Sequence, residues 1–253
     1  MKDGFIRVAA ATPDIHVADP QYNSEQIIEL MEQGSTRGVK VMAFPELCLT
    51  AYTCSDLFLQ ESLLREAKKE LKRILQASKS KDMILFVGMP WMHKGKLYNV
   101  AAVLNRGRIL GIVPKKHLPN YSEFYELRHF NPGMEKVEMT DWEGVQVPMG
   151  MNLLFACRTM PELVLAAELC EDVWVPCPPS ISHALAGATV IANCSASDET
   201  TGKDQYRYNL ICGQSARLVC GYIYANAGEG ESSQDLVFGG QNIIAENGTC
   251  LVQ

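Results

Sequence analysis

The stretch VLAAELCED at residues 164–172 changes character within three residues, and this change indicates the fold. An apolar run ends at Cys170, and the carboxylates of Glu171 and Asp172 follow at once. The pattern predicts a buried strand that stops at the edge of a sheet, with a thiol at its carboxyl end. In open α/β sheets, ligands and catalytic groups gather at this end of the strands. Cys170 is therefore a candidate nucleophile, and the alternative is one more small buried hydrophobe.

Strand and helix patterns alternate upstream of this stretch, which is typical of an α/β fold. Residues 5–11 and 39–44 are predicted strands, and Asn23 is the predicted N-cap of a helix between them. Such a strand–helix–strand unit is right-handed by default. A strand over residues 83–90 and a hairpin over residues 97–113 add antiparallel neighbours, so we expect mixed sheets.

The other elements are predicted in the same way. A long helix capped by Ser55 or Asp56 is expected to run to Ala77, with lysines and glutamates on its solvated face. Downstream we expect strands over residues 147–157, 163–169, 188–193 and 221–228, helices over 181–185 and 204–218, and a hairpin over 236–252. Without repeats or linkers, residues 1–253 are expected to form one domain.

Composition limits the function classes. Hydrophobic residues make up 47% of the 253 residues and charged residues 21%, which describes a soluble globular protein. The formal charge of −6 argues against nucleic acid or an anionic membrane as a partner. Residues 1–5 lead directly into a strand-like segment, and no apolar run approaches the roughly 18 residues of a membrane span. A cytoplasmic protein is expected.

The nine cysteines show neither a disulfide nor a metal pattern. Their odd number, without a secretory signal, argues against a disulfide framework. No Cys-x-x-Cys pair occurs, so we expect no metal site. Most of these thiols are predicted to be packing residues, and one to be reactive.

Two more strand ends carry polar residues. Glu46 follows an apolar strand and a proline, where desolvation would raise its pKa toward that of a general base. A solvated loop residue or a helix cap is the alternative. Lys115 ends the predicted hairpin beside Lys116 and His117, where surface charge is the alternative. If these residues meet Cys170, they supply a base, a cation and a nucleophile without histidine or metal.

Three motifs resemble a known family. FPEL at residues 44–47, PKKHL at 114–118 and ELCED at 168–172 are similar to the Glu-Lys-Cys triad of the nitrilase (carbon-nitrogen hydrolase) superfamily. The longer strings at residues 45–58 and 118–126 resemble the N-terminal glutaminase domains of bacterial glutamine-dependent NAD synthetases. The resemblance covers nearly the whole chain.

The resemblance implies an αββα four-layer sandwich with mixed sheets and a glutaminase reaction. Cys170 would attack the side-chain amide of glutamine, with Glu46 as general base and Lys115 stabilising the oxyanion. Ammonia would leave before the glutamyl thioester is hydrolysed.

The resemblance also implies supporting residues. Tyr121, Ser197 and Lys203 match positions that hold the amino-acid end of glutamine, and Lys203 stands where some relatives have an arginine. Glu126 would be a second acid that orients Lys115.

In that family the glutaminase domain is followed by a synthetase domain. The synthetase uses the ammonia and ATP to convert deamido-NAD to NAD. No glycine-rich phosphate loop of that kind occurs in residues 1–253, so the synthetase domain is expected to be absent from this chain. We therefore expect no cofactor here, since ATP and Mg would belong to the absent domain. The synthetase domain of the same longer protein is the expected partner, together with homo-oligomer formation.

Two alternatives stay open at this point. A stand-alone amidase or carbamoylase of the same superfamily would act on another small amide. A non-catalytic scaffold that docks a partner would not need Cys170 at all.

Overall fold

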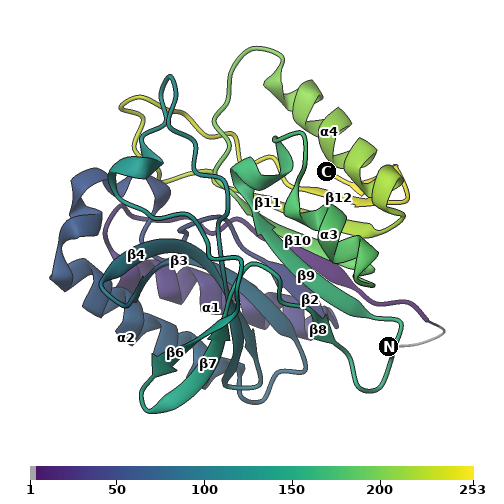
Figure 1. Cartoon of the computed structure of the whole chain (residues 1–253), viewed down its shortest axis with the longest axis horizontal. Coiled ribbons are helices and arrows are strands. Elements are labelled where there is room, and N and C mark those ends of the chain that lie inside the picture. The colour runs from purple at the N-terminus through teal and green to yellow at the C-terminus, as the bar shows by residue number, and fades with distance from the viewer. Residues whose placement is uncertain (1–3) are drawn as a thin grey trace.

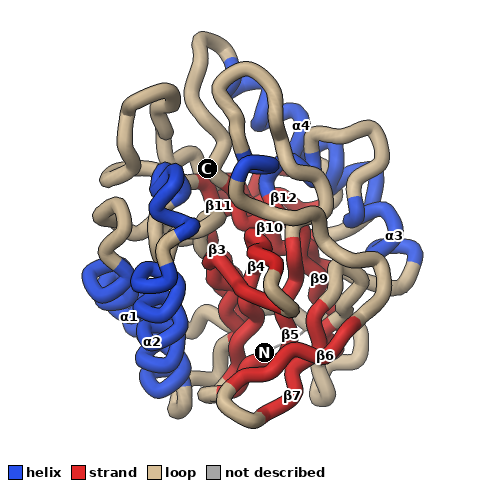
Figure 2. Tube along the Cα trace, turned by 60° about the vertical axis from the view of Figure 1, so that its left-hand side comes forward, coloured by secondary structure: helices blue, strands red, loops and turns tan. Residues whose placement is uncertain are grey.

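Two β-sheets pack face to face in the computed structural model, which describes residues 4–253, and helices cover both outer faces (Figure 1). Figure 2 shows α1 (Pro20–Thr36) and α2 (Glu61–Ser78) on one side of the strands and α3 (Pro179–Leu185) and α4 (Lys203–Leu218) on the other. The expected αββα sandwich is confirmed. The expectation for residues 1–3 lies outside the described residues.

The first sheet has the strand order β1-β2-β3-β4-β5-β7-β6. Strands β1, β2 and β3 are parallel, β3, β4 and β5 are antiparallel, and β7 lies parallel to β5 and antiparallel to β6. The mixed character inferred from the hairpin is therefore confirmed. The bounds are β1 Val8–Ala10, β2 Val41–Ala43, β3 Ile84–His93, β4 Lys96–Asn105, β5 Arg108–Pro114, β6 Glu138–Trp142 and β7 Val145–Met149.

The second sheet has the order β13-β12-β11-β10-β9-β8. Its central strands β9, β10 and β11 are parallel, and antiparallel strands flank them. The bounds are β8 Phe155–Ala156, β9 Val164–Leu169, β10 Val190–Ser195, β11 Gly221–Asn226, β12 Ile243–Glu246 and β13 Thr249–Val252. Strands β9 to β11 lie between the first sheet and the helices α3 and α4, which explains their apolar runs.

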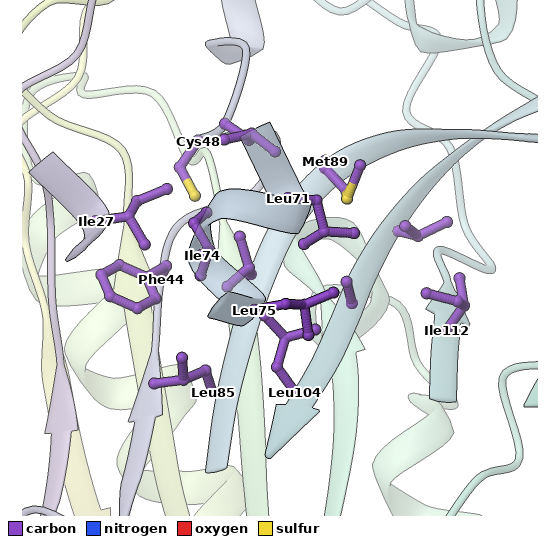
Figure 3. Close-up of a cluster of buried hydrophobic side chains, with 14 of the residues drawn as sticks. Ile27, Phe44, Cys48, Leu71, Ile74, Leu75, Leu85, Met89, Leu104 and Ile112 are labelled. Atoms are coloured by element: carbon purple, nitrogen blue, oxygen red, sulfur yellow. The ribbon is translucent and has the colours of Figure 1, made fainter. Parts of the chain in front are cut away.

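The two-residue side-chain period of a strand places the core on both sides of the first sheet. In β2, Val41 and Ala43 point into the layer between the sheets, whereas Met42 packs under α1 and α2. Figure 3 shows the helix-side core, where Leu71 and Ile74 of α2 meet Leu85 of β3. The sheets are thus held from both faces, and the loops at their ends take up fixed positions.

Both predicted N-caps are wrong. Asp19 caps α1 by accepting a hydrogen bond from the Tyr22 N–H, and Pro20 begins the helix. Asn23 instead lies buried within α1, where its amide bonds the backbone of His16 and the carbonyl of Leu49.

The predicted N-cap of α2 is wrong because Ser55 and Asp56 lie within a short 3₁₀ helix, η1 (Tyr52–Leu59), that precedes α2. Helix α2 begins after Gln60 without a side-chain cap. The Asp56 carboxylate instead receives hydrogen bonds from Arg128 and His129.

The strand predicted over residues 147–157 is divided between the sheets, because β7 ends at Met149 and β8 begins at Phe155. All nine cysteines lie within residues 4–253, and each is a free thiol. In the same described range, no helix is both long and apolar enough to cross a membrane.

Candidate active site

Three strand ends bring the predicted reactive residues together. Glu46 lies three residues after β2, Lys115 directly after β5, and Cys170 directly after β9. Because β2 and β5 belong to the first sheet and β9 to the second, the site lies where the two sheets face each other. All three side chains are buried, so the alternatives of a solvated glutamate and a surface lysine are excluded.

Lys115 lies between two carboxylates. Its Nζ is 2.6 Å from Glu46 Oε1 and 2.6 Å from Glu126 Oε1, in a cluster without solvent contact. Burial alone would lower the pKa of Lys115, but the charges of Glu126 and Glu46 outweigh it and raise the pKa well above the ordinary value. Lys115 is therefore a permanent cation.

Glu46 is held from both sheets. Oε1 accepts hydrogen bonds from Lys115 and, at 2.6 Å, from Asn99 Nδ2 of β4. Oε2 accepts from the Ala196 N–H at 3.1 Å, just after β10 of the second sheet. The Glu46 N–H donates to the Ser195 carbonyl at 3.2 Å. These contacts fix the carboxylate and restrict its rotation.

Cys170 has an unusual backbone. It begins the short 3₁₀ helix η3 (Cys170–Val173) with φ of +39°, in the region that favours glycine. Its N–H donates to Asn193 Oδ1 at 3.1 Å, and only 5% of the residue is exposed. A strained backbone persists where the surroundings hold it, and such strain is concentrated at functional sites.

The Cys170 thiol is protonated at neutral pH. Burial raises its pKa first, and the charge of Glu46 raises it further, while the Lys115 cation and the Ala196 N–H oppose both effects. The net effect is a pKa for Cys170 well above the ordinary value of a thiol. A nucleophilic reaction at this thiol needs a base to remove its proton.

Glu126 lies on the far side of Lys115 and is nearly fully buried. Burial raises its pKa to about 7, the Lys115 cation opposes this rise, and Glu46 adds to it. The Tyr52 hydroxyl donates to Glu126 Oε1 at 2.8 Å, and Asn99 Nδ2 lies 3.4 Å from Oε2. Glu46 and Glu126 thus share the Lys115 cation and the Asn99 side-chain amide.

Asn99 and Tyr52 were missed by sequence reasoning. Asn99 carried a usable signal, because it is a polar residue inside the otherwise apolar strand β4. Its Nδ2 bonds both carboxylates, whereas its buried Oδ1 has no partner among the described residues. Tyr52 had no distinctive signal in its loop.

Two of the predicted substrate-binding residues lie on the rim of the site. Tyr121 is 55% exposed, and its hydroxyl lies 3.1 Å from both carboxylate oxygens of Glu171. The Lys203 Nζ is paired with Asp198 and lies 5.9 Å from the ring centroid of Phe124 and 5.5 Å from that of Trp174. This rim combines one cation, the two carboxylates of Glu171 and Asp198, and aromatic faces.

Ser197 lies deeper, beside Arg207, which the sequence reading did not consider. The Arg207 Nη2 donates to Ser197 Oγ at 3.3 Å and to the Asp198 carbonyl at 2.9 Å. Arg207 is fully buried, and its Nη1 also lies 3.1 Å from Glu199 Oε2. We infer that Arg207 supports the loop that carries Ser197 and Asp198.

A pocket of about 290 Å³ adjoins the cluster through Tyr52 and Glu126. Phe58, Arg128 and Leu236 contribute to its other walls. Cys170, Glu46 and Lys115 are not among its lining residues, so this pocket meets the cluster only at Tyr52 and Glu126. Within residues 4–253, no group of three or more His, Cys, Asp or Glu side chains is placed to hold a metal ion.

Comparison with known proteins extends over nearly the whole chain. Residues 7–253 match the carbon-nitrogen hydrolase family. A curated glutamine-dependent NAD(+) synthetase of Mycobacterium tuberculosis is 42% identical over 250 residues, which cover 99% of this chain and 37% of the relative. The chain thus spans little more than a third of the length of the curated relatives it matches.

Solved structures give the same result. A glutamine-dependent NAD(+) synthetase from Cytophaga hutchinsonii superimposes with a TM-score of 0.88 at 28% identity, over 98% of this chain and 40% of that one. A nitrilase-superfamily amidase from Nesterenkonia shares the fold, with a TM-score of 0.75 at 20% identity over 98% of this chain and 85% of the amidase. The resemblance drawn from the three motifs is confirmed.

Proposed function

Because the chain belongs to the carbon-nitrogen hydrolase family, we propose that it hydrolyses the side-chain amide of glutamine through a thioester on Cys170. The observation that carries this proposal is the buried pair of Glu46 and Lys115 within electrostatic reach of the Cys170 thiol. The choice of glutamine is supported by the NAD(+) synthetases that match the whole chain, which are described as glutamine-dependent.

In the first half-reaction, the Cys170 sulfur bonds to the amide carbon while Glu46 takes the thiol proton. The carbonyl oxygen becomes an oxyanion, which the Lys115 cation stabilises because it is already in place and cannot be screened by water. The bond to nitrogen then breaks, Glu46 returns its proton to the leaving nitrogen, and ammonia departs.

In the second half-reaction, water attacks the glutamyl thioester. Glu46 takes a proton from the water, the carbon–sulfur bond breaks, and the thiolate of Cys170 recovers a proton from Glu46. The products are glutamate and ammonia, and the enzyme returns to its starting state. Glu126 supports both steps as the second acceptor of Lys115.

The amino-acid end of glutamine is assigned to the rim. Tyr121, Ser197 and Lys203 supply hydroxyl donors and a cation for the α-carboxylate, and the half-buried Glu171 carboxylate suits the α-ammonium group. These opposite charges would favour a zwitterionic amino acid over a simple amide.

We assign the use of the released ammonia to a domain outside this chain. A synthetase domain of the same longer protein would use the ammonia and ATP to convert deamido-NAD to NAD, and this part needs no cofactor of its own. A cytoplasmic homo-oligomer is part of the same proposal. The synthetase part of the proposal is supported by the curated NAD(+) synthetases, of which this chain covers only 37%.

The test is an amide panel with the purified chain. Glutamate release from glutamine should exceed hydrolysis of acetamide, butyramide and N-carbamoyl amino acids, and Cys170→Ala should abolish it. A preference for a simple amide would replace this proposal with a stand-alone amidase. An electrophilic glutamine analogue should label Cys170 in peptide mass spectrometry, and labelling of another cysteine would contradict the assigned nucleophile.

A further inference from the structure

The carboxylate of Glu231 binds a segment far away in sequence. Glu231 Oε1 accepts the Tyr52 N–H at 2.7 Å, and Oε2 accepts the Thr53 N–H at 2.9 Å and the Thr53 hydroxyl at 2.5 Å. The Ser232 N–H donates to the same Thr53 hydroxyl at 2.8 Å. A carboxylate can accept the Tyr52 N–H, the Thr53 N–H and the Thr53 hydroxyl at once, whereas an amide, with a single acceptor oxygen, cannot.

The segment that Glu231 holds is strained. Ala51 has φ of +81° and ψ of 150°, and Ser55 has φ of +50° and ψ of −136°, in regions that side chains disfavour. Such a backbone conformation persists only when the surrounding structure holds it. Tyr52 and Thr53 lie between these two residues, at the point where Glu231 bonds the backbone.

Glu231 is itself held in position. The Glu229 carbonyl accepts the Ile15 N–H at 3.3 Å, and Gly230 has φ of +96°. A Cβ atom at Gly230 would lie 1.8 Å from the Ile15 carbonyl oxygen, so only glycine permits this approach. The loop around Glu231 is therefore fixed against the N-terminal part of the chain.

Through Tyr52, the strained segment contacts the reactive cluster, which consists of Glu46, Lys115, Glu126 and Cys170. The Tyr52 hydroxyl donates to Glu126 Oε1, the same oxygen that receives Lys115 Nζ. This hydrogen bond favours the charged form of Glu126 and opposes the effect of burial on its pKa. The charge on Glu126 in turn acts on Lys115 and on the Cys170 thiol.

We propose that Glu231 is a positioning residue for the reactive cluster, which acts through Tyr52 on Glu126. It holds the backbone of Tyr52 so that the phenol reaches Glu126 Oε1. Without the carboxylate, the strained segment relaxes and the phenol leaves Glu126. Glu126 then retains a proton at neutral pH and no longer shares Lys115 as an anion.

The test is a double-mutant cycle between Glu231→Gln and Tyr52→Phe, and its kinetic half rests on the proposed glutaminase function. Glu231→Gln should lower kcat about 10- to 100-fold with little change in KM. In the Tyr52→Phe background, the same substitution should cost less than about twofold, because the shared contact is already lost. Additive losses would overturn the proposal. The matched control is Glu229→Gln on the exposed neighbour, which should match the wild type.

A second readout does not depend on glutamine turnover. Iodoacetamide should alkylate Cys170 severalfold faster in Glu231→Gln and in Tyr52→Phe, because a protonated Glu126 no longer repels the thiolate. General loosening would also expose Cys194 and Cys220, which are buried outside this segment, in β10 and just before β11, so peptide mass spectrometry should show their labelling unchanged. Unchanged Cys170 labelling, or equal increases at all three thiols, would overturn the proposal even if glutamine proves not to be the substrate.

Discussion

The Nζ of Lys115 lies 2.6 Å from Glu46 Oε1, and both side chains are fully buried. Desolvating two charges is expensive, and the pair is tolerated only because further hydrogen bonds satisfy both partners. Asn99 and the Ala196 N–H bond Glu46, and Glu126 bonds Lys115. A stationary base and a stationary cation next to a thiol are what amide hydrolysis requires, because their positions need no reorganisation during the reaction.

The strain at Cys170 predicts an unusual order of stability for two inactive variants. Cys170→Gly should be about 1 kcal/mol more stable than Cys170→Ala, because the φ of +39° costs a residue with a Cβ atom but not glycine. Chemical unfolding of both proteins measures the difference. Ala167→Gly on the preceding strand β9 is the control and should be destabilising. An alanine variant as stable as the glycine variant would contradict the strain.

Removal of the central cation should change the pH dependence of stability. The pKa of Glu126 is about 7 in the folded protein, above its unfolded value of 4.5, so the folded state binds the proton more tightly. Its contribution to stability is therefore lost as the pH rises from about 4.5 to 7. Lys115→Met leaves the buried carboxylates of Glu46 and Glu126 without a cation. The loss of stability with rising pH should therefore become larger in this variant.

Urea unfolding of Lys115→Met at pH 5 and pH 8 measures this effect. The variant should be about 3–5 kcal/mol less stable than the wild type at pH 8 and closer to it at pH 5, because the protonated acids need no counter-charge. A loss that is equal at both pH values would mean that the carboxylates do not depend on Lys115.

Lys203 and Arg207, the two cations near Ser197, should have different roles. We expect Lys203 to bind glutamine and Arg207 to stabilise the fold. Lys203 lies at the rim with 22% of its side chain exposed, so Lys203→Ala should raise the KM for glutamine about tenfold and leave stability nearly unchanged. Arg207 is fully buried and bonds the partly exposed Glu199 carboxylate and the Asp198 carbonyl, so Arg207→Ala should cost about 3–5 kcal/mol of stability. Steady-state kinetics and chemical unfolding of both variants test this assignment. A large loss of stability in Lys203→Ala together with a raised KM in a stable Arg207→Ala would exchange the two roles.

Gly88 should prove essential for the position of Glu46. A Cβ atom there would lie 2.2 Å from the Pro45 carbonyl oxygen and 2.4 Å from the Leu47 nitrogen, so the backbone around Glu46 must move. Gly88→Ala should lower kcat at least about 100-fold. Gly213→Ala in α4 meets open space and should stabilise the protein by about 0.5–1 kcal/mol without loss of activity. Normal activity of Gly88→Ala would show that the segment tolerates displacement.

The three candidate catalytic residues could be predicted because of where they stand in the chain. Glu46, Lys115 and Cys170 each follow an apolar run that ends abruptly, and such a break is visible without any tertiary information. The alternation of strands and helices was equally visible and predicted an α/β fold, and the hairpin over residues 97–113 predicted mixed sheets. Local patterns report local structure well when burial changes within two or three residues.

The predictions that failed concern side chains with more than one available partner. Asn23 is a good N-cap by type, but it bonds the backbone of His16 and Leu49 instead. Asp56 likewise bonds Arg128 and His129, far along the chain, instead of capping α2. Only tertiary contacts decide between such partners, because the competing hydrogen bonds have similar strength.

The sequence by itself determined which residues end the apolar strands, and therefore which acid, lysine and thiol were available. Tertiary structure alone decided that Glu46 and Lys115 of one sheet meet Cys170 of the other. It also decided that Asn99 and Tyr52 complete the cluster, since these residues are distant in sequence and ordinary in type, whereas the family resemblance already predicts Glu126 beside Lys115. The physical reason is burial: water leaves only when the two sheets close, and only then do these charges depend on one another.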